Sequence, residues 1–413
     1  MHKLLIIGAG MATAELLKQL VSFGYEGSIE VIGEEAVSCY NRILLSSILS
    51  AEKTEDDLLL IEQDWYKKHA IKISSNEKVN AVNLESKVAF TSLGRSTDFD
   101  QLVFATGSSP YLPDIPGIHL ENVSGFRNKK DLAVIMELAG QNPGASAVVI
   151  GGGLLGLEAA AGLNKYGLNV TVLNRGRWLM ERQLDAMGGL VLQHYLQKQG
   201  MHFRVGSSPK TIDKGMCGKV ESVTLDNGEI LESDMVLVTA GIVPNIDLAR
   251  QTGIPCHQGI LVNGLLQTEI KDVYALGECC ELDNELFGLI APIRQQAKIL
   301  AATLCDAKTA VFARQTAPVQ LKISGIDVLS AGLTSLLDDV ETQVLIARKK
   351  SIYRCLFIKN RHLVGYILIG DRHLSSWYDE LIAEKQDVSE FRENLMFGIA
   401  THEEISDGVA YEN

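Results

Sequence analysis

Two segments of this chain share one pattern of apolar and polar positions. In residues 4–13 and 147–158 a short apolar run ends in a glycine-rich turn, and apolar residues then recur at helical spacing. The turns carry Gly8 and Gly10 in the first segment, and Gly151, Gly153 and Gly156 in the second. In this context glycine lets the backbone approach a pyrophosphate, which rests on N–H groups at the start of the helix. The pattern predicts two bound dinucleotides, usually a flavin and a nicotinamide nucleotide.

A second strand, over residues 29–32, is expected after the first loop, and it ends at Gly33. Glu34 follows, 21 positions beyond Thr13. An acidic residue about 20 positions after such a loop accepts hydrogen bonds from a ribose 2′-hydroxyl. We therefore expect Glu34 to bind an adenosine ribose, and the alternative is a solvated carboxylate in a turn.

Residues 111–117 and 240–245 contain proline and glycine, and they predict linkers. The second glycine loop lies between them. This order predicts one nucleotide-binding domain inserted into another. We expect a discontinuous first domain over residues 1–112 and 236–312, and a second domain over residues 113–235.

Beyond residue 312 the chain changes to short apolar runs separated by turn residues. Strands are predicted over residues 317–323, 328–331, 344–347, 353–358 and 363–369, which gives a small α+β domain over residues 313–413. Apolar residues at roughly helical spacing predict a helix over residues 381–399. Residues 379–413 form an acidic tail, in which ten acids and two bases supply −8 of the net charge of −13.

Six bases fall in the last domain within a stretch that contains no acid: Arg348, Lys349, Lys350, Arg354, Lys359 and Arg361. One interpretation is a solvated strand surface. The other is a docking patch for an acidic electron carrier, because such charges speed encounter with a partner of opposite sign. The sequence leaves both open.

Composition argues against several other classes of protein. A net charge of −13 argues against nucleic-acid binding. No apolar run reaches the roughly 20 residues of a membrane-spanning helix, and the start leads directly into a strand, so we expect no membrane association and a cytoplasmic protein. The seven cysteines form no C-x-x-C pair, and we expect reduced structural thiols and no metal site.

Taken together, the motifs resemble the two-dinucleotide flavoprotein reductases of the pyridine nucleotide-disulfide type. The matching segments are the loops at Gly8 and Gly151 and residues 105–107, 239–245 and 273–278. A closer resemblance joins the chain to the flavoprotein portion of assimilatory nitrite reductase large subunits, and to the related rubredoxin and nitrate reductase electron-transfer flavoproteins. Residues 40–47, 151–160, 183–189, 277–279 and 321–328 carry it. The resemblance implies an α/β fold with two Rossmann-like, glutathione-reductase-like domains, one inserted in the other, and a small C-terminal α+β domain.

The resemblance further implies that FAD binds the first loop. Gly8 and Gly10 would hold its pyrophosphate, Glu34 its ribose and Arg42 a phosphate. Glu278 would bond the ribityl chain, where many relatives carry aspartate.

Two positions depart from the family pattern. Thr13 replaces the usual third glycine, and its small side chain predicts a tight but workable fit. Ser47 stands where relatives place a lysine near the flavin N5, so that positive charge is missing here. The remaining members of the expected cofactor-binding set are Thr106, Gly107, Gly241 and Gly277.

The second loop would hold the nicotinamide nucleotide, and Glu158 would lie near the nicotinamide and orient it. A helix-surface carboxylate is the alternative for Glu158. The following strand ends at Asn174, which is neutral, and Arg175 and Arg177 come next. These arginines could pair a 2′-phosphate, whereas asparagine can still bond a hydroxyl. The pattern leans toward NADPH and leaves NADH open.

The function that follows from the resemblance is an FAD-dependent NAD(P)H:acceptor oxidoreductase. Hydride transfer to a flavin depends on alignment and needs no general acid or base, so the lack of a catalytic His or Cys is expected. Cys39 is the only thiol beside the 40–42 segment, and it does not stand where a redox cysteine is expected.

The acceptor is expected to be a separate protein, since the chain ends at Asn413 without the clustered cysteines of iron–sulfur or sirohaem modules. Rubredoxin, a ferredoxin, or a nitrate or nitrite reductase component would serve. Two rivals stay open: a non-catalytic flavoprotein that senses NAD(P)H, and an NADH oxidase. A homodimer is also open.

Overall fold

The computed structural model describes residues 2–37, 39–215, 218–308, 311–312, 319–335 and 337–398. The chain divides into two units, which are described separately below. The first comprises Met1–Tyr111, Arg127–Lys129 and Gly241–Gln315, and the second comprises Leu112–Phe126, Lys130–Ala240 and Thr316–Asn413.

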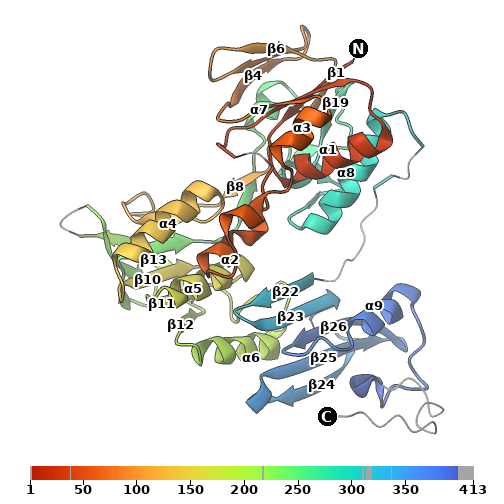
Figure 1. Ribbon diagram of the computed structural model, residues 1–413. Coiled ribbons are helices and arrows are strands. Elements are labelled where there is room, and N and C mark those ends of the chain that lie inside the picture. Colours follow the sequence, from red (N-terminus) through yellow and green to blue (C-terminus); the bar gives the residue numbers. More distant parts are fainter. Residues whose placement is uncertain are drawn as a thin grey trace. The chain divides into compact units, whose positions relative to one another are not determined.

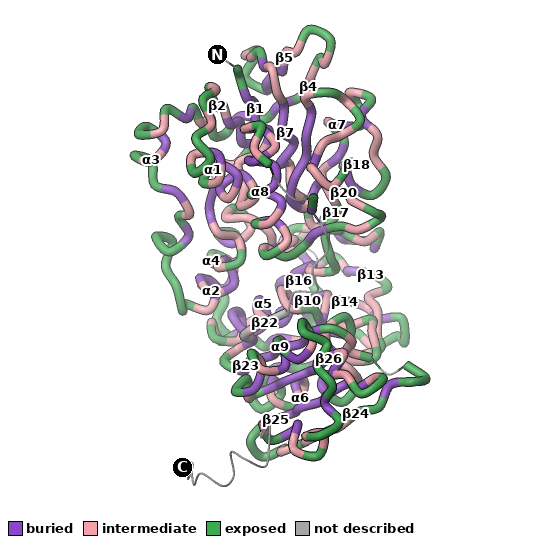
Figure 2. The backbone as a smooth tube through the Cα atoms, turned by 90° about the vertical axis from the view of Figure 1, so that its right-hand side faces the viewer, coloured by how far each residue is buried: buried purple, intermediate pink, exposed green. Residues whose placement is uncertain are grey.

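The first unit is built on a five-stranded parallel sheet of order β19-β7-β1-β2-β3 (Figure 1). Its apolar runs are buried along their length, as expected for parallel strands that are covered on both faces (Figure 2). Helices α1 and α8 pack together against this core. The bounds are β1 Lys3–Ile7, α1 Met11–Phe23, β2 Ser28–Ile32, β3 Ile71–Ser74, β7 Gln101–Phe104, β19 Val273–Ala275 and α8 Ile290–Leu304.

Smaller elements complete the first unit. An antiparallel meander contains β4 Val79–Asn83, β5 Val88–Thr91 and β6 Ser96–Asp98, and a two-stranded ribbon contains β8 Ser108–Pro110 and β17 Ile242–Pro244. The others are η1 Arg42–Leu44, α2 Leu45–Leu49, η2 Glu55–Leu58, α3 Gln63–Lys68, α7 Asp247–Gln251, β18 Ile260–Leu261, η3 Gly277–Cys279, β20 Cys280–Leu282 and β21 Glu285–Leu286.

The second unit repeats the design with a parallel sheet of order β12-β11-β10-β16-β9. Its main elements are β9 Val123–Gly125, α4 Lys129–Gln141, β10 Ser146–Ile150, α5 Leu154–Lys165, β11 Asn169–Asn174, α6 Ala186–Gln197, β12 His202–Val205 and β16 Met235–Val238. A meander of β13 Pro209–Lys214, β14 Val220–Leu225 and β15 Ile230–Glu232 adds to its core. The predicted fold with two Rossmann-like domains is confirmed.

The C-terminal part is an antiparallel sheet of order β22-β23-β26-β25-β24, which belongs to the second unit. The bounds are β22 Val319–Ile323, β23 Ile326–Gly332, β24 Glu341–Ala347, η4 Arg348–Lys350, β25 Ile352–Lys359, β26 His362–Ile369, α9 Ser375–Glu384 and η5 Leu395–Phe397. One face packs on α9. The other faces α6 (Figure 1). On that side the Tyr353 hydroxyl donates to Asp185 Oδ2 at 2.5 Å. The predicted small α+β domain is confirmed, although residues 317 and 318 lie outside the described residues.

The predicted helix over residues 381–399 is wrong. Helix α9 ends at Glu384, because Lys385 adopts the left-handed conformation at φ 49°. Leu381, Val388 and Leu395 stand seven positions apart and imitate one helical stripe, yet they reach one core from three separate segments: α9, irregular backbone and η5. A truncation after Asp379 would therefore open this core as well as remove the acidic residues. Ile399 lies outside the described residues.

Candidate dinucleotide-binding sites

The first glycine loop brings backbone close to backbone. Gly8 has φ 108°, and a Cβ there would stand 2.2 Å from the carbonyl oxygen of Ala105 at the end of the adjacent strand. Gly10 is the N-cap of α1, and none of the described side chains caps this helix. Its first N–H groups are thus available to an anion, and the helix dipole favours negative charge there.

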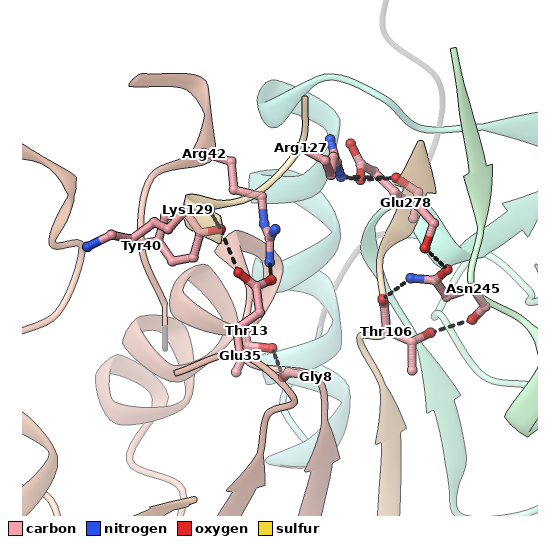
Figure 3. A network of polar contacts seen from close by, with 12 residues as sticks. Gly8, Thr13, Glu35, Tyr40, Arg42, Thr106, Arg127, Lys129, Asn245 and Glu278 are labelled. Atoms are coloured by element: carbon pink, nitrogen blue, oxygen red, sulfur yellow. Dashed lines mark hydrogen bonds and ion pairs between the residues drawn. The ribbon is translucent and has the colours of Figure 1, made fainter. Parts of the chain in front are cut away.

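Thr13 occupies the third position of this loop. It is fully buried, and its hydroxyl donates to the Gly8 carbonyl oxygen at 2.7 Å (Figure 3). In the second loop the same position is Gly156, where a Cβ would stand 2.0 Å from the Gly151 carbonyl oxygen. The first loop is therefore wide enough for threonine and uses its hydroxyl as a brace.

Arg42 reaches the first loop from η1. A Cβ on Gly10 would have the Arg42 Nη2 atom as its nearest described neighbour, at 4.0 Å. The guanidinium forms an ion pair with Glu35, which also accepts a 2.6 Å hydrogen bond from the Tyr40 hydroxyl (Figure 3). Burial raises the pKa of Tyr40, so this phenol stays protonated and donates. The guanidinium is placed where it can meet a phosphate on the loop.

Two adjacent glutamates follow β2, and their side chains pair with different bases. Glu34 is exposed and forms an ion pair with Lys78 at 3.2 Å. Glu35 faces Arg42 at the loop. The expected role of Glu34 at the ribose stays a prediction. Sequence reasoning missed Glu35, for which the only signal is its place directly after Glu34.

A second polar cluster lies beside the same loop. The turn at Gly277 touches the start of α1, since a Cβ on this glycine would stand 2.9 Å from Ala12 Cβ. The next residue, Glu278, accepts a 2.7 Å hydrogen bond from the Ser108 hydroxyl and forms an ion pair with Arg127 (Figure 3). Arg127 was missed by the sequence analysis because it lies 151 residues from Glu278 along the chain. A ligand held by Glu278 would therefore also meet a guanidinium.

Thr106 and Gly107 join two chain segments. The Thr106 hydroxyl donates to the Asn245 carbonyl oxygen at 2.6 Å, and the Asn245 amide donates to the Thr106 carbonyl oxygen at 2.9 Å (Figure 3). Gly107 and Gly241 both have positive φ, of 65° and 126°. These contacts hold β8 against β17, and the cofactor contacts expected of Thr106, Gly107 and Gly241 stay predictions.

The second loop repeats the features of the first. Gly151 has φ 127°, and a Cβ there would stand 2.5 Å from the Thr239 carbonyl oxygen. Gly153 is the N-cap of α5, again with no cap from a described side chain. Both sheets thus end in a glycine turn and a helix start suited to a pyrophosphate.

Three further expected site residues lie on named elements. Glu158 is in α5, one turn beyond Gly153, and Ser47 is in α2; both are half-buried. Asn174 ends β11, and its side chain contacts the backbone of the second loop. Arg175 follows it and is exposed. Their contacts with a nucleotide or with the flavin stay predictions.

Cys39 is unsuited to redox chemistry with a small substrate. Its side chain is fully buried, and burial raises the pKa of its thiol to about 11. Since the thiolate is the nucleophile, this cysteine is inert at neutral pH. Within the described residues no group of three or more His, Cys, Asp or Glu could hold a metal ion, and no helix is long and apolar enough to cross a membrane.

Comparison with known proteins agrees with this architecture. Residues 2–302 match the family described as pyridine nucleotide-disulphide oxidoreductase, and residues 318–386 match the rubredoxin NAD+ reductase C-terminal domain. Two dinucleotide-binding sheets, each with its own glycine loop, define the class as a two-nucleotide oxidoreductase. The chain belongs to the pyridine nucleotide-disulphide oxidoreductase family, and the resemblance drawn from the sequence is confirmed.

Individual proteins similar to this chain include reductases and electron-transfer subunits. A nitrite reductase [NAD(P)H] of Bacillus subtilis is 37% identical over 94% of this chain and 48% of its own length. An assimilatory nitrate reductase electron transfer subunit of the same species is 33% identical over 94% of this chain and 50% of its own length. The crystal structure of NADH:rubredoxin oxidoreductase from Clostridium acetobutylicum superposes with a TM-score of 0.78 at 25% identity, covering 98% of this chain and 99% of that one. The chain spans about half the length of the two Bacillus relatives.

Proposed function

We propose that this chain is an FAD-dependent NAD(P)H:acceptor oxidoreductase, with FAD on the first loop and NAD(P)H on the second. The observation that carries the proposal is the repetition of one anion-binding design in two parallel sheets. Each sheet ends in a glycine with positive φ, and each following helix is left uncapped by the described side chains. Each helix start can therefore accept one pyrophosphate.

The residues of the first loop fit FAD. The start of α1 and the Arg42 guanidinium would share its pyrophosphate, and Glu278 with Arg127 would hold the ribityl chain. When bound, FAD takes a hydride from NAD(P)H and passes the electrons on singly. The protein contributes alignment, because hydride transfer needs no proton donor.

The proposed acceptor is a separate redox protein of the rubredoxin or small iron–sulfur type, or a nitrate or nitrite reductase component. The names of the relatives support this class of acceptor. A cytoplasmic location and a homodimer stay predictions.

Only three of the six bases in the basic stretch of the last domain form an exposed group of charges without a described ion pair. Arg348, Lys349 and Lys350 are exposed on η4. The other three bases are paired: buried Arg354 with Asp371, Lys359 with Asp339, and Arg361 with Asp387. A docking patch would therefore have three charges, and the choice between docking and simple solvation stays open.

The test is anaerobic stopped-flow mixing of the FAD-loaded protein with NADH and with NADPH, followed by the loss of flavin absorbance. Rapid bleaching is expected, and reduced protein should then reduce rubredoxin or a ferredoxin. Gly151→Val is the matched control, because its side chain would collide with the Thr239 carbonyl while the first loop stays unchanged. It should retain FAD and chemical reduction by dithionite but lose reduction by NAD(P)H.

Failure to bleach despite bound FAD would overturn the proposal. Very slow reduction with a long-lived charge-transfer band would favour the sensor alternative. The cysteine-dependent oxidase alternative predicts that Cys39→Ser loses activity, and the burial of Cys39 predicts that activity remains.

A further inference from the structure

The strand that should carry the ribose-binding acid of the second loop ends in an amide whose two donors are already used. The Asn174 Oδ1 atom accepts from the Gly152 N–H at 3.3 Å, and its Nδ2 atom donates to the carbonyl oxygens of Gly176 and Trp178 at 3.1 and 2.7 Å. Both N–H groups of the amide are used. Asn174 therefore acts as a clamp that joins the glycine loop to residues 176–178, and it has no donor left for a nucleotide.

A carboxylate returns to this place from further along the chain. Glu181 Oε1 accepts from the Arg177 N–H at 2.7 Å. The same carboxylate lies against Gly176, where a Cβ would stand 2.0 Å from Glu181 Oε2. Only glycine fits at residue 176 while the carboxylate is there.

The fold fixes the route by which Glu181 returns. Met180 has φ 55°, is buried, and donates its N–H to the Gly152 carbonyl oxygen at 3.0 Å. The residue before Glu181 is thus tied to the glycine loop itself. The carboxylate is held against Gly176 and Arg177, just beyond the end of β11, although the residue as a whole is exposed.

We propose that Glu181 supplies the acid that Asn174 lacks, so that this chain selects NADH over NADPH. The inference rests on the proposed function, because it assigns the second loop to a nicotinamide nucleotide. In dinucleotide-binding domains the end of this strand meets the adenosine ribose. A carboxylate there accepts a hydrogen bond from a free 2′-hydroxyl and repels a 2′-phosphate.

Arg175 and Arg177 do not reverse this preference. Both arginines are exposed, as Glu181 is, but the Glu181 carboxylate is held in place by the Arg177 N–H. The backbone N–H of Arg177, which could help to seat a phosphate, is already taken by Glu181. The structure thus opposes the lean toward NADPH that Asn174, Arg175 and Arg177 suggest in sequence.

The first experiment measures binding without redox chemistry. FAD-loaded protein is titrated calorimetrically with 5′-AMP and with 2′,5′-ADP, which differ only by the 2′-phosphate. The wild type should bind 5′-AMP more tightly by a factor on the order of ten or more, the worth of a charged hydrogen bond. Glu181→Gln keeps an acceptor for the Arg177 N–H and removes the charge, so the preference should shrink about tenfold or reverse.

Two further variants control the result. Glu232→Gln removes one exposed charge at the end of β15 and should leave the preference unchanged. Glu181→Asp keeps the charge and should keep the preference for 5′-AMP. In each variant, the preference for NADH or NADPH in stopped-flow reduction should match its preference for 5′-AMP or 2′,5′-ADP in the titrations.

A wild type that prefers 2′,5′-ADP and NADPH would overturn the inference, as would a Glu181→Gln variant with an unchanged preference. Loss of the preference in Glu232→Gln would also overturn it. If neither nucleotide reduces the flavin but 5′-AMP discrimination still depends on Glu181, the proposed function fails, whereas the role of Glu181 in excluding a 2′-phosphate stands.

Discussion

Thr13 gives a sharp test of how the first loop is braced. Its hydroxyl is fully buried and donates to the Gly8 carbonyl oxygen at 2.7 Å. Valine has nearly the same shape, so packing alone ranks it as the best replacement. We expect it to be the worst of three. Its methyl group would stand 2.7 Å from that oxygen, where a carbon–oxygen contact needs about 3.3 Å.

The loop must therefore open by about 0.6 Å in Thr13→Val, the difference between about 3.3 Å and the observed 2.7 Å. Loss of a buried hydrogen bond costs about 1–3 kcal/mol, and overpacking adds about 1 kcal/mol or more. We expect the free energy of unfolding of the first unit to fall by about 3 kcal/mol in Thr13→Val. Thr13→Ala should lose about 2 kcal/mol, and Thr13→Ser about 1 kcal/mol.

Urea unfolding is measured with and without a fixed excess of FAD, because bound ligand adds a contribution to stability that depends on the FAD affinity of each variant. Flavin fluorescence reports release from the first loop, and circular dichroism reports unfolding. The Ser, Ala and Val variants should lose FAD in that order of increasing ease. A valine variant as stable as the serine variant would refute the assignment of the brace to the hydroxyl.

Three other predictions concern separate parts of the chain. Asn174→Asp removes both donors to Gly176 and Trp178. Titration should therefore show that 5′-AMP and 2′,5′-ADP both bind more weakly, by roughly tenfold. Tighter binding of 5′-AMP alone would contradict the role of Asn174 as a clamp. Arg95 holds the pKa of Glu77 down to about 2. Because the folded pKa is depressed, the stability that the Glu77 charge contributes is present above its unfolded pKa, near 4.3, and is lost as the pH falls through about 2. The difference in free energy of unfolding between wild type and Glu77→Gln should therefore be largest at pH 7 and shrink in urea melts at pH 4 and 3. Tyr353→Phe deletes the bond to Asp185 and should cost about 1–3 kcal/mol, with faster hydrogen exchange in α6 and β25; Tyr111→Phe, at an exposed site, should change neither.

The two nucleotide-binding sheets could be predicted because their signals are local. A strand buried on both faces is apolar throughout, and a turn that needs positive φ selects glycine. Gly8 and Gly151 therefore mark the ends of β1 and β10 in the sequence itself. The C-terminal strands β23, β25 and β26 were predictable for the same reason, since they are mostly buried. The helix over residues 381–399 was not, because apolar residues in an irregular segment can imitate a helical period.

The tertiary structure decided which side chains surround the two loops. The sequence offers Glu34 and Glu35 as neighbours, and only the path after β2 turns one to Lys78 and the other to Arg42. Arg127 meets Glu278 across 151 positions, and Glu181 reaches Gly176 only because Met180 turns back onto the glycine loop. Sequence by itself determined the strands of the two nucleotide-binding sheets and the two anion-binding loops, since periodicity and allowed φ values are properties of short segments. The charges that face each loop were set by the tertiary structure, because they depend on where distant segments meet and which way each side chain points.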